Sequence, residues 1–264
     1  MTEHPIPSTG PAGRPVPQEV EAALVVVAQA PHAVLDQIAT RSSLGGFLLC
    51  PHPDRQIHDT YYDTTDSALG ARCFSLRLRR LDGRVLLTLK GAAAGADATL
   101  KTRRELEAEW SAATLHDVLA ELAQHGIHLP SPPLGDPSQS LTALGLHIIQ
   151  ERHTHRRPRE VSRGMGAPVL AEMALDAVTF HLPGREVRHC EIEVEAAHGA
   201  TPADVKEISR ALQEAYPGRL QPWPFAKLTL GFALLRLQQE GCLERLLTPQ
   251  GTLRPVAYRL LRLG

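Results

Sequence analysis

The sequence predicts an α+β fold in which antiparallel strands carry one apolar and one charged face and helices flank them. Residues 74–90 (FSLRLRRLDGRVLLTLK) are two runs of strand-forming residues joined by Asp82-Gly83, a turn signal typical of a tight hairpin. Residues 191–195 (EIEVE) repeat this alternation with carboxylates in place of arginines. A chain of 264 residues suffices for one large β-rich domain or two small ones, and either can bury a core.

The composition argues against several classes of partner. Lys+Arg 28 and Asp+Glu 29 give a net charge of −1, and two Trp with five Phe offer few platforms for stacking bases. No apolar run is long enough to span a bilayer, and the N-terminus lacks the pattern of a signal peptide. Cys50, Cys73, Cys190 and Cys242 are scattered and form no CxxC pair, which favours a reducing compartment. We therefore predict a cytoplasmic protein without nucleic-acid or membrane partners.

The first predicted strand follows a tail. Residues 1–18 are rich in Pro and Gly and poor in large apolar residues, which predicts disorder. Residues 19–29 (EVEAALVVVAQ) then read as a strand that places Glu19, Glu21 and Ala23 on one face. Two carboxylates at successive positions of one strand face can chelate a hard divalent cation, although the same pattern is common on solvated faces.

The segments that follow lead into the hairpin and past it. We expect a helix at 30–43, a strand at 56–64 and a helical turn at 67–72. In the hairpin, Arg77 and Arg79 share one face, and Lys90 lies on the corresponding face of the second strand. Taken alone, this basic row is either a solvated face or an anion-binding surface. Because the opposite face is apolar, truncating these cations should weaken anion binding more than folding.

Residues 101–110 (KTRRELEAEW) allow two interpretations. Their composition favours a helix. Read with period two, Arg103, Glu105 and Glu107 share a face opposite Leu106 and Trp110, and the neighbouring strands favour this strand interpretation. Around this segment we expect a loop at 91–97, a helix at 113–126, a proline-rich crossover at 130–137 and a short helix at 138–144.

The second half of the chain alternates again. A strand at 147–161 places Arg152 and Arg156 on one face, and strands at 169–180 and 186–196 each carry a row of carboxylates. A Pro-Gly turn at 183–184 joins the last two strands, and helices are expected at 203–216 and 226–239. The carboxylate rows are Glu172 with Asp176, and Glu191 with Glu193 and Glu195.

Histidines are the other candidate ligands in this half. His153 and His155 lie on the face opposite the arginines, and His189 precedes Cys190. No complete set of ligands has the fixed spacing of a zinc site, so the sequence does not favour a zinc site here.

Several short motifs occur in the order found in one known family. Over roughly Glu19 to Leu235 the chain resembles the CYTH domain family, the triphosphate tunnel metalloenzymes. Two positions depart from the family pattern. Ala23 replaces the lysine of E-x-E-x-K, and Ala226 replaces the serine before Lys227. The motifs are Glu19-x-Glu21, YYDT at 61–64, LRLR at 76–79, TLKG at 88–91, Arg103-x-Glu105-x-Glu107, ALD at 174–176, EIEVE at 191–195 and AKLTLGFAL at 226–234.

The resemblance implies a closed antiparallel barrel of about eight strands around a charged tunnel, with flanking helices. The barrel domain would span residues 19–240 and precede a basic C-terminal extension, 241–264, whose role the sequence leaves open. Mg²⁺ or Mn²⁺ would be the cofactor, and a metal-oriented or carboxylate-oriented water would attack the terminal phosphorus. The implied residues are Glu19, Glu21, Glu191 and Glu193 for the metal, Glu105 and Glu107 for catalysis, and Arg77, Arg79, Lys90, Arg103, Arg152, Arg156 and Lys227 for the triphosphate.

The implied function is metal-dependent hydrolysis of inorganic triphosphate or of a nucleoside or thiamine triphosphate. Because Ala23 removes one cation, a triphosphate- or polyphosphate-binding module with little or no turnover is the alternative. A class IV-type adenylate cyclase, which the family also contains, is a further alternative. If the enzyme interpretation holds, Ala23→Lys should raise the rate. A homodimer is compatible with the sequence.

Overall fold

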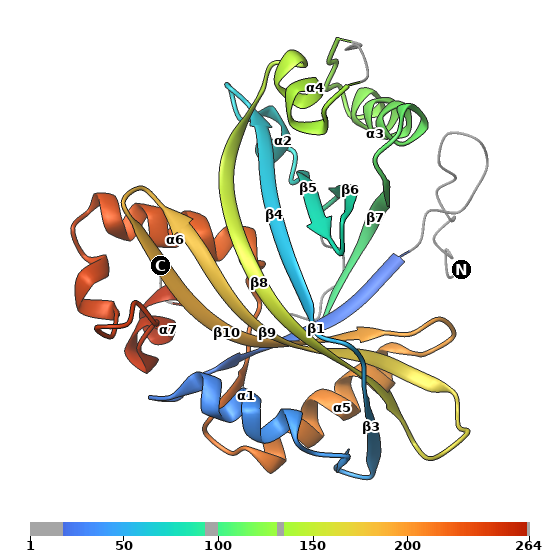
Figure 1. Cartoon of the computed structure of the whole chain (residues 1–264), viewed down its shortest axis with the longest axis vertical. Coiled ribbons are helices and arrows are strands. Elements are labelled where there is room, and N and C mark those ends of the chain that lie inside the picture. The colour runs from blue at the N-terminus through green and yellow to red at the C-terminus, as the bar shows by residue number, and fades with distance from the viewer. Residues whose placement is uncertain (1–17, 93–99, 131–134, 263–264) are drawn as a thin grey trace, which may run out of the picture. The chain divides into compact units, whose positions relative to one another are not determined.

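The fold is a ring of hydrogen-bonded strands. The computed structural model describes residues 18–92, 100–130 and 135–262, so the predicted tail, except Gln18, and most of the predicted 91–97 loop lie outside it. Eight strands follow the order β8-β4-β5-β6-β7-β1-β10-β9, and β9 pairs again with β8, which closes the barrel that was predicted (Figure 1). The strands are β1 Gln18–Val26, β4 Arg55–Thr64, β5 Ser75–Leu81, β6 Arg84–Lys90, β7 Lys101–Glu109, β8 Leu146–Ser162, β9 Val169–Leu182 and β10 Arg185–Ala196.

Three short strands extend this ring. β2 (Ser43–Leu44) pairs with β3 (Phe47–Pro51), which pairs with β8, and β11 (Leu220–Pro222) pairs with β1. The ambiguous segment at 101–110 is a strand, β7, because pairing with β6 outweighs its helical composition.

The predicted helices are confirmed within a few residues at each end, and the described part of the C-terminal extension adds two further short helices. None of the helices in the described ranges is both long and apolar enough to span a membrane. The helices are α1 Pro31–Ala39, α2 Ala68–Ala71, α3 Ala112–Gln124, α4 Pro137–Ala143, α5 Pro202–Ala215, α6 Lys227–Gln239, η1 Leu243–Leu246 and α7 Pro255–Leu261.

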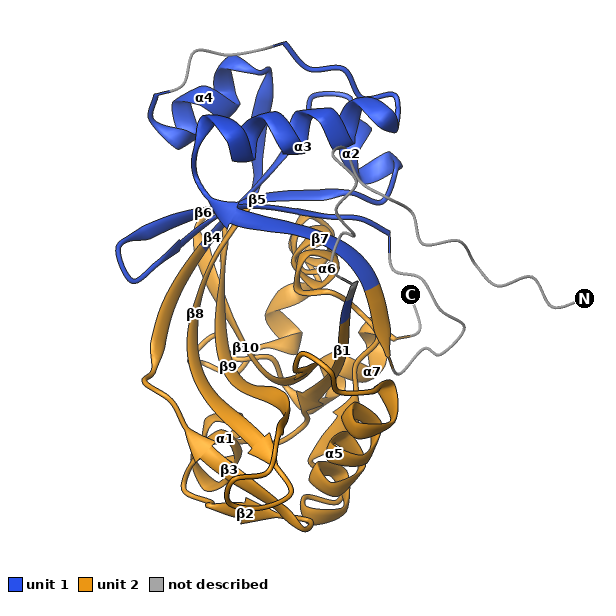
Figure 2. Ribbon diagram, turned by 90° about the vertical axis from the view of Figure 1, so that its right-hand side faces the viewer, with its two compact units in different colours: residues 1–19, 59–94, 103–149 blue, residues 20–58, 95–102, 150–264 orange. Residues whose placement is uncertain are grey.

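The chain divides into two compact units (Figure 2). Unit 1 comprises residues 1–19, 59–94 and 103–149 and holds the hairpin β5–β6 with helices α2, α3 and α4. Asp82 and Gly83 both have positive φ, 51° and 78°, as the tight hairpin turn requires. Leu76 and Leu78 are buried against apolar side chains of α3, so the predicted apolar face of the hairpin is the core face.

Unit 2 comprises residues 20–58, 95–102 and 150–264 and has two apolar clusters. One lies between strands β1, β9 and β10 and helices α1 and α5 and includes the buried Leu24 and Ile192. The other joins Val25, Val178 and Phe180 to residues of α6, η1 and α7. Residues of the C-terminal extension therefore supply part of the buried core of this unit.

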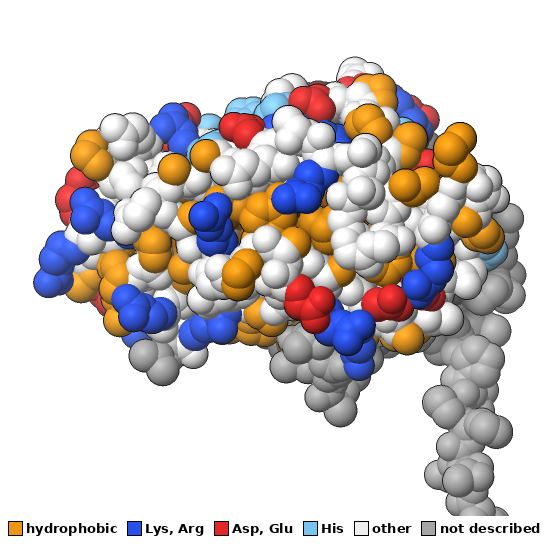
Figure 3. All heavy atoms as spheres, turned by 90° about the horizontal axis from the view of Figure 1, so that it is seen from below, with side chains coloured by type: hydrophobic (Ala, Val, Ile, Leu, Met, Phe, Trp, Pro, Cys, Tyr) orange, Lys and Arg blue, Asp and Glu red, His pale blue; other side chains and the backbone are white. Residues whose placement is uncertain are grey.

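Charged and hydrophobic side chains share the face seen in Figure 3. Lys and Arg side chains are dispersed there among hydrophobic and neutral ones. The exposed large hydrophobic residues of the described chain include Met165 and Phe232, and Val256 with Leu260, which lie four residues apart on α7.

Candidate functional site

Three carboxylates converge in unit 2. Asp176 on β9 lies directly opposite Glu191 on β10, and Glu193 follows two residues later on the same strand face. Oxygen atoms of the three side chains all lie within 4.8 Å of one another. The alternation in the sequence predicted both rows, and strand pairing brings them together. Carboxylate oxygens are the ligands that hard divalent cations prefer.

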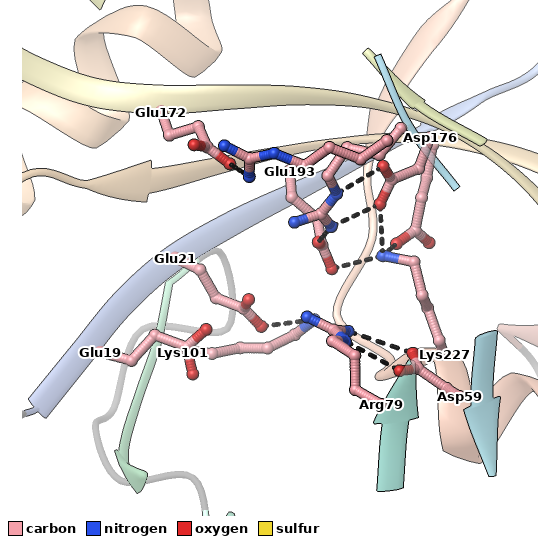
Figure 4. Close-up of polar contacts among 12 residues, drawn as sticks. Glu19, Glu21, Asp59, Arg79, Lys101, Glu172, Asp176, Glu193 and Lys227 are labelled. Atoms are coloured by element: carbon pink, nitrogen blue, oxygen red, sulfur yellow. Dashed lines mark hydrogen bonds and ion pairs between the residues drawn. The ribbon is translucent and has the colours of Figure 1, made fainter. Parts of the chain in front are cut away.

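Two cations hold these carboxylates together. Lys227, the first residue of α6, points between them: its Nζ lies 3.1 Å from Asp176 Oδ2 and 2.5 Å from Glu193 Oε1, and it also pairs with Glu191 (Figure 4). Arg156 on β8 donates two hydrogen bonds to Asp176, at 2.8 and 2.7 Å, and one to Glu193 at 2.6 Å. Two of the predicted phosphate-binding residues, Arg156 and Lys227, are thus bound to the carboxylate cluster.

The electrostatics of this cluster favour the charged forms of Lys227, Glu191 and Glu193. Burial alone would lower the pKa of Lys227, but Glu191, Glu193 and Asp176 together raise it above the ordinary value. Burial disfavours the charged form of Glu191, yet Lys227 and a hydrogen bond from His189 lower its pKa to about 2. The pKa of Glu193 is also held well below its usual range, against burial, by Lys227 and Arg156. At neutral pH Lys227, Glu191 and Glu193 are therefore all charged.

A buried chain of hydrogen bonds leads from the cluster to the C-terminal helix. His189 Nε2 lies 2.7 Å from Glu191 Oε2, and His189 Nδ1 lies 3.0 Å from the hydroxyl of Tyr258 on α7. Both His189 and Tyr258 are buried. Cys190 packs in the apolar cluster on the opposite face of β10, where burial raises its pKa to about 12, so His189 and Cys190 do not form a joint ligand pair.

Unit 1 carries the predicted basic row, and each of its cations has a carboxylate partner. Arg79 binds Asp59 through two hydrogen bonds, at 2.8 and 3.1 Å (Figure 4). Arg77 donates a hydrogen bond to Glu107 at 3.1 Å. Burial disfavours the charge of Arg77, but Asp59, Tyr61 and Glu107 outweigh this effect and raise the pKa of Arg77. Asp59 is almost fully buried. The sequence did not indicate Asp59 as a site residue, because its role becomes visible only through its contact with Arg79 in the hairpin.

The rest of this row contacts the acidic residues predicted for metal binding and catalysis. Lys90 Nζ lies 2.8 Å from Glu19 Oε2 and 3.0 Å from Glu105 Oε2. Arg103 Nε donates to Glu19 at 3.2 Å. Burial acts to raise the pKa of Glu107. Arg77 and Arg79 lower it by a larger amount, so the net shift is downward.

Three further predicted positions lie in unit 2. Glu21 pairs with Lys101 at 3.6 Å, and Lys101 also donates to the carbonyl of Phe225, a role for Lys101 that no motif indicated. Arg152 is buried on the same face of β8 as Arg156. Ala23 lies on the face of Glu21, as strand parity predicted, and opposite Glu193, but it packs in the apolar cluster of α6 and α7.

Comparison with known proteins adds a family match. A model of the CYTH domain family matches residues 36–219. No curated protein is a match to this chain. Among solved structures, a Hippeastrum protein assigned as an adenylyl cyclase, with a dominant triphosphatase activity, is 18% identical with a TM-score of 0.52, covering 83% of this chain and 96% of its own. A protein of Pyrococcus horikoshii is 18% identical with a TM-score of 0.49, over 81% of this chain and 98% of its own.

Proposed function

The chain belongs to the CYTH domain family, and from this membership and its charge clusters we propose that it hydrolyses a triphosphate-containing small molecule with Mg²⁺ or Mn²⁺. The observation that carries the proposal is the convergence of Asp176, Glu191 and Glu193 around Lys227. Three neighbouring carboxylates, of which Asp176 and Glu191 are buried and Glu193 is partly buried, would be costly without cations, and here they are held close together. A site of this kind is suited to binding a divalent cation and an anionic substrate together.

The residues present fit a hard divalent cation. Mg²⁺ usually takes one or two carboxylates and keeps several waters, and Glu191 with Glu193 would supply such a pair. When bound, the metal would neutralise charge that develops on the phosphate oxygens. Lys227 already contacts all three carboxylates, so its ammonium would have to give up part of these contacts. Glu19 and Glu21 are further proposed ligands, each now paired with lysine or arginine.

The basic residues would hold the phosphates. Arg77 and Arg79 present planar guanidinium groups that can bind phosphate oxygens through two parallel hydrogen bonds. In the structure these groups hold carboxylates, Asp59 and Glu107 among them, and a phosphate would exchange with these partners. Glu105 and Glu107 are proposed to orient the attacking water, because Glu107 remains ionised beside Arg77. Lys90, Arg103, Arg152, Arg156 and Lys227 are the remaining proposed phosphate ligands.

One observation favours a second candidate function, a triphosphate- or polyphosphate-binding module without turnover. Ala23 stands where the family pattern has a lysine, and its side chain is 4% exposed among apolar neighbours. A missing ammonium removes a charge-assisted hydrogen bond of roughly 1.5–3 kcal/mol, which corresponds to about a tenfold to hundredfold loss in rate or affinity.

Phosphate release separates the two candidates. Tripolyphosphate, ATP and thiamine triphosphate should each be tested with and without Mg²⁺ or Mn²⁺, and cyclic AMP should be measured in the ATP reactions to test for a cyclase. We expect metal-dependent release that is lost in Glu193→Gln and kept in Glu207→Gln, a carboxylate that binds Arg163 elsewhere in unit 2. Tripolyphosphate binding without release would support the binding module. Neither binding nor release would overturn both proposals.

A further inference from the structure

Three histidines meet on the outward face of unit 2. His58 on β4, His153 on β8 and His181 on β9 belong to three neighbouring strands. The rings of His58 and His153 are stacked with centroids 4.2 Å apart, and those of His153 and His181 are perpendicular at 4.8 Å. His153 is exposed, whereas its neighbours Arg152 and Thr154 are buried, because successive side chains of a strand point to opposite faces.

Two of these rings aim nitrogen atoms at each other. His153 Nδ1 lies 2.6 Å from His181 Nε2, which is shorter than the range of about 2.7–3.2 Å typical of N–H···O hydrogen bonds. Only one of the two nitrogens can carry a proton in this arrangement, so the other presents its lone pair. The far nitrogen of His181, Nδ1, lies 3.6 Å from Glu186 Oε1. This distance is too long for a hydrogen bond, but a carboxylate beside the far nitrogen is a common partner of a metal-binding imidazole.

Carboxylates surround the rest of the group. Glu151 lies directly opposite His181 in the pairing of β8 with β9, and its Oε1 is 3.7 Å from His58 Nε2. The histidine cluster, His58, His153 and His181, therefore combines three imidazoles with two carboxylates on one exposed surface. Imidazole nitrogen is a ligand that suits Zn²⁺, Ni²⁺ and Cu²⁺, whereas Mg²⁺ and Mn²⁺ favour oxygen.

We propose that the histidine cluster binds a transition-metal ion, with His153 Nδ1 and His181 Nε2 as ligands in place of the proton between them. A tetrahedral zinc with Zn–N distances of about 2.0–2.1 Å places two ligand nitrogens about 3.3 Å apart. The rings must therefore separate from 2.6 Å, and His153 can move because it lies at the surface. In the described residues, the one group of three potential ligands that already lie close together is Asp176, Glu191 and Glu193. A third ligand of the histidine cluster must therefore come from His58 or Glu151 by rotation of its side chain.

The test is a zinc titration that does not depend on activity. ZnCl₂ is titrated into the whole chain in excess Mg²⁺, so that oxygen-ligand sites are occupied, and heat is recorded for wild type, His153→Ala, His181→Ala and His155→Ala. His155 lies on the same face of β8 and binds Asp54 at 2.9 Å, which makes it the matched control. We expect one zinc ion per chain, bound at least tenfold more weakly after either of the first two substitutions and unchanged in the control.

A second measurement guards against misfolding. Because His153 is at the surface, its alanine variant should melt like wild type without zinc, and only wild type and the control should melt higher with zinc. Equal zinc affinity in all four proteins, or equal loss in the control, would overturn the proposal and point to scattered binding by the 13 histidines of the chain.

Discussion

The hydroxyl of Tyr258 lies 3.0 Å from Nδ1 of His189, whose opposite nitrogen lies 2.7 Å from Glu191. Tyr258 belongs to α7, beyond residues 36–219 that match the family model. The C-terminal extension therefore reaches the carboxylate cluster through one imidazole. A ligand oriented in this way is held in one position before a cation binds.

Tyr258→Phe should lower the apparent affinity for Mn²⁺ by about tenfold, because partners behind a metal ligand typically contribute 10–100-fold. It leaves a buried imidazole nitrogen without its partner, so stability should also fall by roughly 1–3 kcal/mol. Tyr216→Phe is the matched control, since Tyr216 is also a buried residue but its hydroxyl accepts a hydrogen bond from Arg41. Melting and Mn²⁺ titration of both variants check this. A Mn²⁺ affinity that falls equally in both would contradict the role of Tyr258.

The sequence predicted the strands and the face on which each side chain lies better than it predicted which side chains contact each other. A side-chain period of two placed Arg77 with Arg79, and Glu191 with Glu193, because that period is fixed by strand geometry. It could not predict that Asp59 binds Arg79, or that Tyr258 binds His189, because these contacts join residues 20 and 69 positions apart. His58 and His181 were missed for the same reason. They meet His153 only through strand pairing.

Stability of the metal-free protein should fall in acid through Glu191. Burial opposes its ionisation, but Lys227 and His189 lower its pKa from the ordinary 4.5 to about 2. A depressed carboxyl pKa contributes stability above about pH 4.5, and this contribution is lost as the pH falls to about 2. The loss should be on the order of 3 kcal/mol. Unfolding free energies at several pH values should fall less steeply in Glu191→Gln, and parallel profiles would refute the assignment.

Lys227→Met should destabilise the protein and make it more responsive to divalent cations. Removing one partner of a buried ion pair typically costs about 3–5 kcal/mol, because the remaining charges stay buried. Mn²⁺ could then occupy the space of the ammonium, so the rise in melting temperature on adding Mn²⁺ should exceed that of wild type. Melting curves with and without MnCl₂ check this. A variant that is destabilised but gains nothing from Mn²⁺ would mean that these carboxylates do not bind the ion.

Arg79→Ala should cost more stability than the strand pattern suggests. The alternation places Arg79 away from the core, which predicts a nearly neutral substitution, but the structure pairs it with the buried Asp59. After the substitution Asp59 still has Arg77 as a partner at 3.6 Å, which limits the cost. We therefore expect the free energy of unfolding to fall by roughly 1–3 kcal/mol. Arg84→Ala in the same hairpin, where the pair with Glu109 is exposed, should cost less than about 1 kcal/mol. Chemical denaturation of both variants gives the comparison, and equal losses would count against the role of Asp59.

Ala23→Lys should lower stability without raising the rate of phosphate release. Strand parity alone suggested the opposite result, since it places residue 23 on the face of Glu21, where the family pattern has a lysine. The structure confirms the face, because Ala23 lies opposite Glu193, but shows apolar packing around it. Overpacking a buried site typically costs about 1–3 kcal/mol.

The charge of the new lysine adds to this cost. Glu193, the carboxylate opposite Ala23, already holds Lys227 and Arg156, so a new ammonium would compete with them and not fill a gap. Ala23→Leu separates the two effects, because it adds volume without charge. Melting temperature and phosphate release from tripolyphosphate should be measured on one preparation of each variant. If Ala23→Lys gains activity while Ala23→Leu does not, the lysine reaches the phosphates and the packed cluster yields to it.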